Sequence, residues 1–225
     1  MQEITIRSSS GLCNRIRLLT TALSHSQTVR MVWQKTTACP AYWHELFQPH
    51  PRVKIASGGN GKGRLNRQGR NLCILEFVPV FEIPKIGTSY IAAHIRRTDI
   101  ETVLRRRKIR SISDEEFYVA IDRGLESNEV VFLATDNCFT QRRFAARYGN
   151  RLVTWGVIET NGSRWRPKRC TSVQRAVEDL HTCIFANEFV GTDGSSFSGE
   201  IQWTRKNGLY ASQQRPGVNA LVLPP

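Results

Sequence analysis

The fold class is indicated by the stretch of residues 2–33, "QEITIRSSSGLCNRIRLLTTALSHSQTVRMVW". Its first part, residues 2–7, alternates polar and apolar side chains, which is typical of a β-strand. After the turn "SSSG", apolar side chains recur with helical spacing, so residues 12–27 are predicted to form an amphipathic helix. The apolar segment 29–33 is predicted to be a second strand. Strand, helix and strand in this order form the unit of a parallel α/β sheet.

The same pattern resumes in the second half of the chain. We predict strands at 90–95, 129–135, 151–155 and 188–192, helices at 113–124, 138–147 and 171–186, and another helix opening within 195–203. Ser113 and Glu116 form a capping box that starts the first of these helices. Between the halves, 72–80 is predicted to be a strand and 81–89 a linker. We therefore predict two Rossmann-like domains, 1–85 and 86–225, that face a cleft.

Composition narrows the class of protein. The chain has 225 residues, 40% of them apolar, so it can bury a core, and its net charge of +13 predicts an anionic partner. No apolar run approaches the roughly 20 residues that span a bilayer, and no signal peptide is evident. We therefore expect a cytoplasmic protein. The six cysteines are scattered without a Cys-x-x-Cys pair, which favours buried thiols over a zinc site.

Two basic segments carry charge without an evident motif. Residues 56–70, "ASGGNGKGRLNRQGR", are predicted to be a mobile loop. Its Gly61-Lys62 pair is not a nucleotide P-loop, because Gly63 stands where that motif needs serine or threonine. Residues 105–110, "RRRKIR", are predicted to be a charged loop that attracts anions.

The turn Ser8–Arg15 is the first candidate anion site. It follows the first strand, and its backbone N–H groups begin a helix whose positive end favours an anion. Gly11 permits a tight turn there, and Asn14 and Arg15 add side-chain donors.

The stretch "HIRRTD", His94 to Asp99, is the second candidate, at the end of the strand 90–95. Arginine suits bidentate phosphate binding. Neighbouring side chains on a strand point to opposite faces, so we expect one of Arg96 and Arg97 to bind a ligand and the other to be structural.

Three further positions follow later elements. Asp136 lies at a strand end, Asp179 lies on a helix, and the small polar turn Gly194–Phe197 precedes another helix. The hydroxyl and backbone donors of this turn, which includes Ser195 and Ser196, suit a phosphate group or a base edge.

The chain resembles the GDP-fucosyltransferase superfamily in four motifs, which occur in the order GLxNR, HxRRTD, ATD and DL…GSSFS. This superfamily includes protein O-fucosyltransferases, α1,6-fucosyltransferases and bacterial nodulation fucosyltransferases. The segment "VWQKTTACPAYWHELF" also resembles small bacterial and viral members. The resemblance covers about residues 4–203. It implies a GT-B fold whose C-terminal half binds GDP-fucose and whose cleft receives a glycan or another hydroxyl acceptor.

The resemblance also implies roles for single residues. His94 would contact the guanosine, Arg96 the β-phosphate and Asp179 the guanine. Ser195 and Ser196, beside Phe197, would contact the phosphates. Asn14 and Arg15 would close the site, with Arg97 as a supporting arginine. Glu101 is the candidate catalytic base, with Glu45 as a second candidate.

The chemistry that the resemblance implies is inverting transfer without a cofactor. The sequence has no Asp-x-Asp, the motif that holds a metal in many glycosyltransferases, so we expect a metal-independent reaction in which Arg96 stabilises the departing diphosphate. Two alternatives stay open. In the first, the same fold uses a different GDP- or UDP-linked sugar as its donor. In the second, the chain is a basic nucleic-acid-binding protein.

Overall fold

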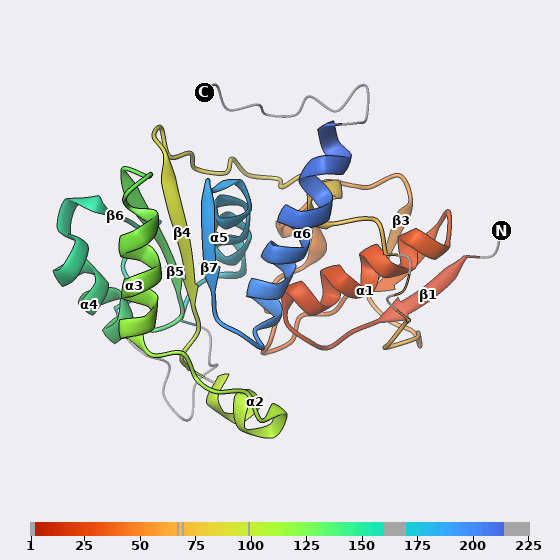
Figure 1. Ribbon diagram of the computed structural model, residues 1–225. Helices are drawn as coiled ribbons and strands as arrows, with labels where there is room; N and C mark the ends of the chain where they lie inside the picture. The colour runs from red at the N-terminus through yellow and green to blue at the C-terminus, as the bar shows by residue number, and fades with distance from the viewer. Residues whose placement is uncertain (1–2, 67, 69, 99, 160–169, 214–225) are drawn as a thin grey trace.

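In the computed structural model, the chain folds into two parallel β-sheets, and helices pack against both (Figure 1). The structure describes residues 3–66, 68, 70–98, 100–159 and 170–213, without the side chains of 101–103 and 208–213. The predicted α/β class is confirmed. No helix within the described residues is both long and apolar enough to cross a bilayer.

The N-terminal sheet has the strand order β1-β2-β3, with its strands at Ile4–Arg7, Val29–Val32 and Val53–Ala56. Helix α1, Leu12–His25, connects the first two strands, as the sequence predicted. Strand β3 was not predicted. It is four residues long, and its burial does not alternate, so the short Val-Lys-Ile pattern is too brief to mark a strand.

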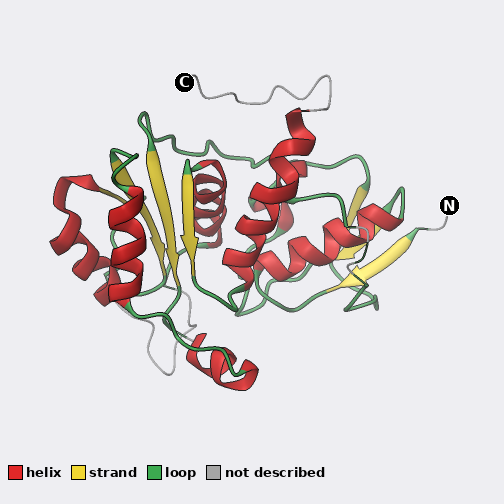
Figure 2. Cartoon of the chain, viewed as in Figure 1, coloured by secondary structure: helices red, strands yellow, loops and turns green. Residues whose placement is uncertain are grey.

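The C-terminal sheet has the strand order β6-β5-β4-β7 (Figure 2). The strands are β4 (Tyr90–Ile95), β5 (Val130–Thr135), β6 (Leu152–Val153) and β7 (Glu188–Gly191). The helices are α2 (Ile100–Arg107), α3 (Asp114–Gly124), α4 (Cys138–Tyr148), α5 (Val173–Phe185) and α6 (Ser196–Gln213). Short 3₁₀ turns occur at Trp43–Glu45, Ile74–Glu76 and Gly149–Arg151. All pairings are parallel, so the carboxyl ends of these strands meet at one edge.

Strand β4 is buried on both faces and separates two hydrophobic clusters. Ile91, Ala93 and Ile95 pack into the cluster that includes Phe117 of α3 and Phe144 of α4. Tyr90 and Ala92 pack on the opposite face, in a larger cluster that includes α5, α6 and the apolar side of α1. This larger cluster joins the two halves of the chain through one core.

Helix α6 leaves the C-terminal sheet and packs against α1 of the N-terminal half (Figure 1). Glu200 of α6 is fully buried there. Its carboxylate accepts from Arg17 Nε at 3.1 Å and from Arg70 Nη2 at 2.5 Å. The guanidinium of Arg70 also lies 3.9 Å from the ring centroid of Trp203. A buried ion cluster therefore holds α6 against the N-terminal half.

Two sequence predictions were wrong. The segment 72–80 is not a strand: Ile74–Glu76 form a 3₁₀ turn that contacts α1 and α6, and the side chains of Leu72, Ile74 and Phe77 are buried. A short apolar run fills a core equally well without pairing. Arg105–Arg107 are not in a loop, because they end helix α2, in which Ile100 and Leu104 are buried one turn apart.

The predicted mobile loop at 56–70 is partly held by β1. The backbone of Lys62 pairs with Thr5 and Arg7 through hydrogen bonds of 3.0 and 3.1 Å. The neighbouring Gly61 lies so close to β1 that a Cβ atom there would stand 2.7 Å from the carbonyl carbon of Ile6. Glycine is required at 61 because of this close backbone approach.

We expect Gly61→Ala to lower the free energy of unfolding by about 1–3 kcal/mol, since the added methyl group displaces backbone. Gly58→Ala is the matched control, because a Cβ at Gly58 meets nothing within 4 Å. Urea denaturation of both variants measures the difference. Equal stability of the two variants would show that the 61–63 segment does not rest on β1.

Candidate active site

The turn after β4 is held from both sides at the carboxyl edge of the sheet. On one side, Thr192, directly after β7, accepts the backbone N–H of Arg96 on its Oγ1 at 3.0 Å. On the other side, Asp136, directly after β5, accepts the backbone N–H of Arg97 at 2.8 Å and also the hydroxyl of Thr98. Asp136 therefore fixes the shape of this turn with both carboxylate oxygens.

Arg97 is built into the structure. Its Nη1 donates to the carbonyl of Ile112 at 2.6 Å, and its Nη2 pairs with Asp114 of α3 at 2.5 Å. Its guanidinium also lies 5.6 Å from the ring centroid of Phe117. Arg97 thus occupies the α3 side of the sheet, in the supporting position that the sequence assigned to one arginine of the pair.

Arg96 is the first residue after β4, directly before Arg97, and its side chain is half-buried. Burial lowers the pKa of the neighbouring His94 imidazole to about 3, and the positive charge of Arg96 contributes to the same shift. His94 is therefore neutral near pH 7. Arg96, and not the histidine, supplies the positive charge on this side of the sheet.

His94 is held by the start of α6. Its ring stacks on Phe197, with centroids 4.4 Å apart and planes 25° apart. Its Nδ1 lies 2.7 Å from Ser198 Oγ. Both partners come from the first turn of α6, so the histidine and this helix end form one rigid unit.

The N-terminus of α6 lies beside α1, from the other half of the chain (Figure 1). Arg17 of α1 donates from Nη2 to the carbonyl of Ser196 at 2.6 Å. Ser195 is buried, and its Oγ accepts the backbone N–H of Phe197 at 3.3 Å. Before it, Gly194 has a φ of +71°, a conformation that favours glycine. The positive end of this helix is suited to an anion.

The predicted turn at the start of α1 has a simpler geometry than expected. Gly11 caps the helix with φ −64° and ψ 166°, which any residue adopts, so a tight glycine turn is not needed. Asn14 is exposed. No side chain caps this helix end, and the backbone N–H of Asn14 donates to Gly11 O at 3.1 Å.

Arg15 lies inside the N-terminal half. It is 0% exposed, and its three nitrogens donate to Ser10 O at 2.7 Å, Gln34 O at 2.7 Å and Thr36 Oγ1 at 2.9 Å. In this arrangement it positions the turn around Ser10 from within the N-terminal half.

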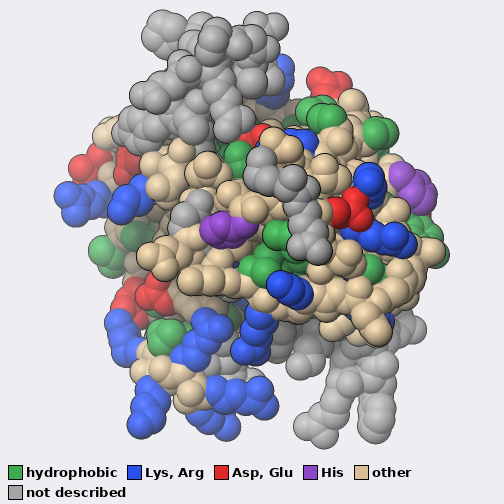
Figure 3. All heavy atoms as spheres, turned by 90° about the vertical axis from the view of Figure 1, so that its right-hand side faces the viewer, with side chains coloured by type: hydrophobic (Ala, Val, Ile, Leu, Met, Phe, Trp, Pro, Cys, Tyr) green, Lys and Arg blue, Asp and Glu red, His purple; other side chains and the backbone are tan. Residues whose placement is uncertain are grey.

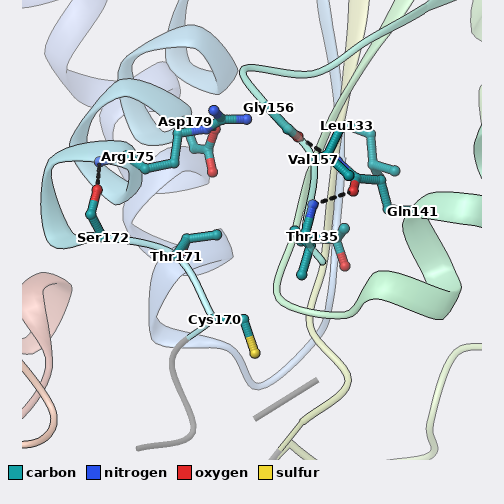
Figure 4. Close-up of a pocket in the computed structure, with 11 residues that line it drawn as sticks. Leu133, Thr135, Gln141, Gly156, Val157, Cys170, Thr171, Ser172, Arg175 and Asp179 are labelled. Carbon is teal, nitrogen blue, oxygen red and sulfur yellow. Dashed lines mark hydrogen bonds and ion pairs between the residues drawn. The ribbon is translucent and has the colours of Figure 1, made fainter. Parts of the chain in front are cut away.

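A pocket of about 180 Å³ lies between the start of α5 and the chain after β6 (Figure 4). Its lining residues are Leu133, Thr135, Gln141, Gly156, Val157, Ile158, Cys170, Thr171, Ser172, Arg175 and Asp179. It adjoins the turn after β4, because Thr135 at the end of β5 donates from Oγ1 to Ile95 O at 2.7 Å.

Asp179 is the buried acid of this pocket. Burial raises the pKa of its carboxyl to about 7, and the Arg175 guanidinium, whose Nε donates to Asp179 Oδ1 at 2.8 Å, opposes that rise. On the facing wall, Gln141 is fixed by a bond to Gly156 O at 2.7 Å and by the N–H of Ile158 at 2.7 Å (Figure 4). The pocket therefore offers a carboxylate acceptor within a preformed wall.

Of the two candidate catalytic bases, Glu101 and Glu45, only the side chain of Glu45 is described. The side chain of Glu101 and the residue Asp99 lie outside the described residues. Glu45 pairs with Lys35 at 2.9 Å and closes a capping box with Tyr42. These hydrogen bonds hold the pKa of Glu45 below its ordinary value, so it is a structural carboxylate. Among the described residues, no three His, Cys, Asp or Glu side chains lie close enough to share a metal ion.

Several residues that shape the site were not found from the sequence. Ser198 and Thr192 form hydrogen bonds with His94 and with the backbone of Arg96. Arg17 of the N-terminal half donates to the carbonyl of Ser196 in the C-terminal half. Only Arg175 had a local signal, because it precedes Asp179 by four residues on a predicted helix.

Comparison with known proteins gives matches in structure alone. No protein-family model matches the chain, and no curated protein sequence matches it. A solved structure of NodZ α-1,6-fucosyltransferase soaked with GDP-fucose matches with TM-score 0.57 and 12% identity, over 89% of this chain and 91% of that one. The NodZ α-1,6-fucosyltransferase co-crystallized with GDP matches with TM-score 0.56, 12% identity and the same coverage. The fucosyltransferase NodZ from Bradyrhizobium matches with TM-score 0.57 and 12% identity, over 89% and 92%.

This likeness establishes the fold. The chain has a mixed α/β fold with two parallel sheets that matches the fold of a fucosyltransferase.

Proposed function

We propose that the chain is a GT-B-type, metal-independent, inverting glycosyltransferase that transfers fucose from GDP-fucose to a glycan hydroxyl. One observation carries the proposal: Arg96, the N-terminus of α6 and the Asp179 pocket lie along one carboxyl edge of the C-terminal sheet. A cation and the N-terminus of a helix are suited to the diphosphate of a nucleotide, and the adjacent pocket is suited to the nucleotide's base. The fold likeness to NodZ supports the same assignment.

The nucleotide would lie with its guanine in the Asp179 pocket. Guanine presents two adjacent N–H donors, on N1 and N2, and a carboxylate accepts both. The diphosphate would extend toward Arg96 and the N-terminus of α6, where Ser195 precedes the helix and Ser196 begins it. His94, neutral and stacked on Phe197, would contact the nucleoside without adding charge.

In the reaction, the acceptor hydroxyl oxygen bonds to the anomeric carbon while the bond from that carbon to the β-phosphate oxygen breaks. Negative charge grows on the departing GDP, and Arg96 and the α6 dipole would stabilise it. A base takes the hydroxyl proton. We propose Glu101 in that role, on the resemblance of its position just after the HxRRTD stretch.

Calorimetric titration of the whole chain with GDP, GDP-fucose and UDP in the presence of EDTA tests the proposal. We expect micromolar binding of GDP and GDP-fucose and at least tenfold weaker binding of UDP. A preference for UDP would replace the donor while keeping the class of enzyme. Absence of binding by all three nucleotides would refute the nucleotide-sugar assignment.

The affinity for GDP should depend on pH through Asp179. Because its raised pKa is about 7, the carboxyl is mostly protonated below that pH, and one of its two oxygens then carries a proton and no longer accepts a guanine N–H group. GDP binding should therefore weaken about tenfold from pH 8 to pH 6. Asp179→Asn should bind GDP weakly at both values and lose this dependence. An unchanged pH dependence in the variant would remove Asp179 from the base pocket.

A further inference from the structure

The end of helix α2 carries a concentrated positive charge. Arg105, Arg106, Arg107 and Lys108, together called the α2 patch, are all exposed. Figure 3 shows Lys and Arg side chains gathered at the lowest part of the molecule, the level that α2 occupies in Figure 1.

The charge of the α2 patch is not compensated within the described part of the chain, where no ion pair involves any of its four residues. The nearby Arg110 differs, because Glu116 pairs with it through bonds of 3.0 and 2.5 Å. Clustered cations of this kind raise the local concentration of anions.

The α2 patch stands at the rim of the candidate site. Helix α2 starts soon after Arg96 in the chain, and its last turn reaches the other phosphate-binding segment, where Arg107 Nη1 donates to Gly194 O at 3.3 Å. Leu104 packs over the same glycine, since a Cβ at Gly194 would stand 3.1 Å from Leu104 Cδ2. After α2, Lys108 adopts a φ of 56° and turns the chain back, so that Ile109 N–H bonds to Leu104 O at 3.0 Å.

We propose that the α2 patch binds the carboxylate, sulfate or phosphate groups of a negatively charged glycan, which is the acceptor of the transfer. This inference rests on the proposed function, because the rim of a nucleotide-sugar site is where an acceptor enters. Complementary charge steers and orients such a chain. A membrane-binding helix presents an apolar face, whereas Ile100 and Leu104 of α2 are buried. Only cations therefore face outward from the last turn.

The test compares two triple variants with the same loss of charge. Arg105→Gln, Arg106→Gln and Lys108→Gln remove most of the α2 patch. Lys85→Gln, Arg123→Gln and Arg142→Gln remove three exposed cations elsewhere. The probes are heparin oligosaccharide, polygalacturonate oligosaccharide and neutral dextran of matched length, with fluorescence anisotropy as the readout. The α2 variant should bind both anionic glycans about tenfold more weakly, since each exposed ion pair contributes a factor of about two to three.

The control variant should bind the anionic glycans within twofold of the original chain, and dextran should bind none of the three proteins measurably. Equal losses in the two variants would overturn the inference, because net charge alone would then explain binding. Tighter binding of duplex DNA or of phosphatidylglycerol vesicles than of either glycan would overturn it in favour of another partner.

Calorimetry with GDP on the same preparations separates this inference from the proposed function. Both variants should bind GDP as the original chain does. If the original chain fails to bind GDP, the proposed function fails, and with it the acceptor role. If GDP binding is intact and the α2 variant keeps its affinity for anionic glycans, the inference alone fails.

Discussion

Replacement of Arg96 with alanine is expected to lower kcat/KM for transfer by about 10²–10⁴-fold while the fold stays intact. A guanidinium that pairs with a diphosphate makes charge-assisted hydrogen bonds of about 1.5–3 kcal/mol each, and a bidentate pair makes two. The loss should fall mainly on kcat, because the leaving diphosphate gains charge in the transition state. Steady-state kinetics with GDP-fucose and an accepted glycan measures it.

The fold should survive this change because the tie between Arg96 and β7 is made by its backbone N–H, which alanine keeps. Arg142→Ala is the control: it removes an exposed arginine of α4 and should leave activity within twofold. Arg97→Ala is unsuitable as a control, since Arg97 pairs with Asp114 and bonds to Ile112 O. Full activity of Arg96→Ala, or unfolding of that variant, would contradict a phosphate-binding role.

Glu200→Gln should lower the free energy of unfolding by about 3–5 kcal/mol. The carboxylate is 0% exposed and pairs with both Arg17 and Arg70. Glutamine keeps the size of the side chain and removes its charge, so two largely buried guanidinium groups lose their counter-ion. Urea denaturation followed by circular dichroism measures the change.

The control is Glu3→Gln, which removes an exposed carboxylate paired with Lys54 at 2.8 Å. Its expected cost is below about 1 kcal/mol, because water screens such pairs. If Glu200→Gln unfolds with the same free energy as Glu3→Gln, the buried ion cluster does not hold α6 against the N-terminal half.

The consequence for the site is direct, since α6 carries Phe197 and Ser198 against His94 and presents its positive end beside α1. Loosening α6 should therefore weaken GDP binding as well as stability. The same helix serves as a structural link between the halves and as one wall of the candidate active site.

Features that depend on neighbours along the chain can be predicted from the amino-acid order. Period-two and helical spacing marked β1, β4, β5, α1 and α5, and the Ser113–Glu116 capping box located the start of α3. The alternation of β4 separated Arg96 from Arg97, because adjacent strand residues face opposite sides. These signals lie in local backbone geometry and persist in any fold that uses the elements.

Features that depend on contacts between distant segments became visible in the folded chain. Arg15 was predicted from its place beside a helix end, and the fold buries it inside the N-terminal half, where it donates to Ser10, Gln34 and Thr36. Arg17, by contrast, had no distinguishing local pattern and joins α1 to α6. The use of an arginine depends on which carbonyls and carboxylates the packing brings within about 3 Å of it, and no spacing along the chain encodes that distance.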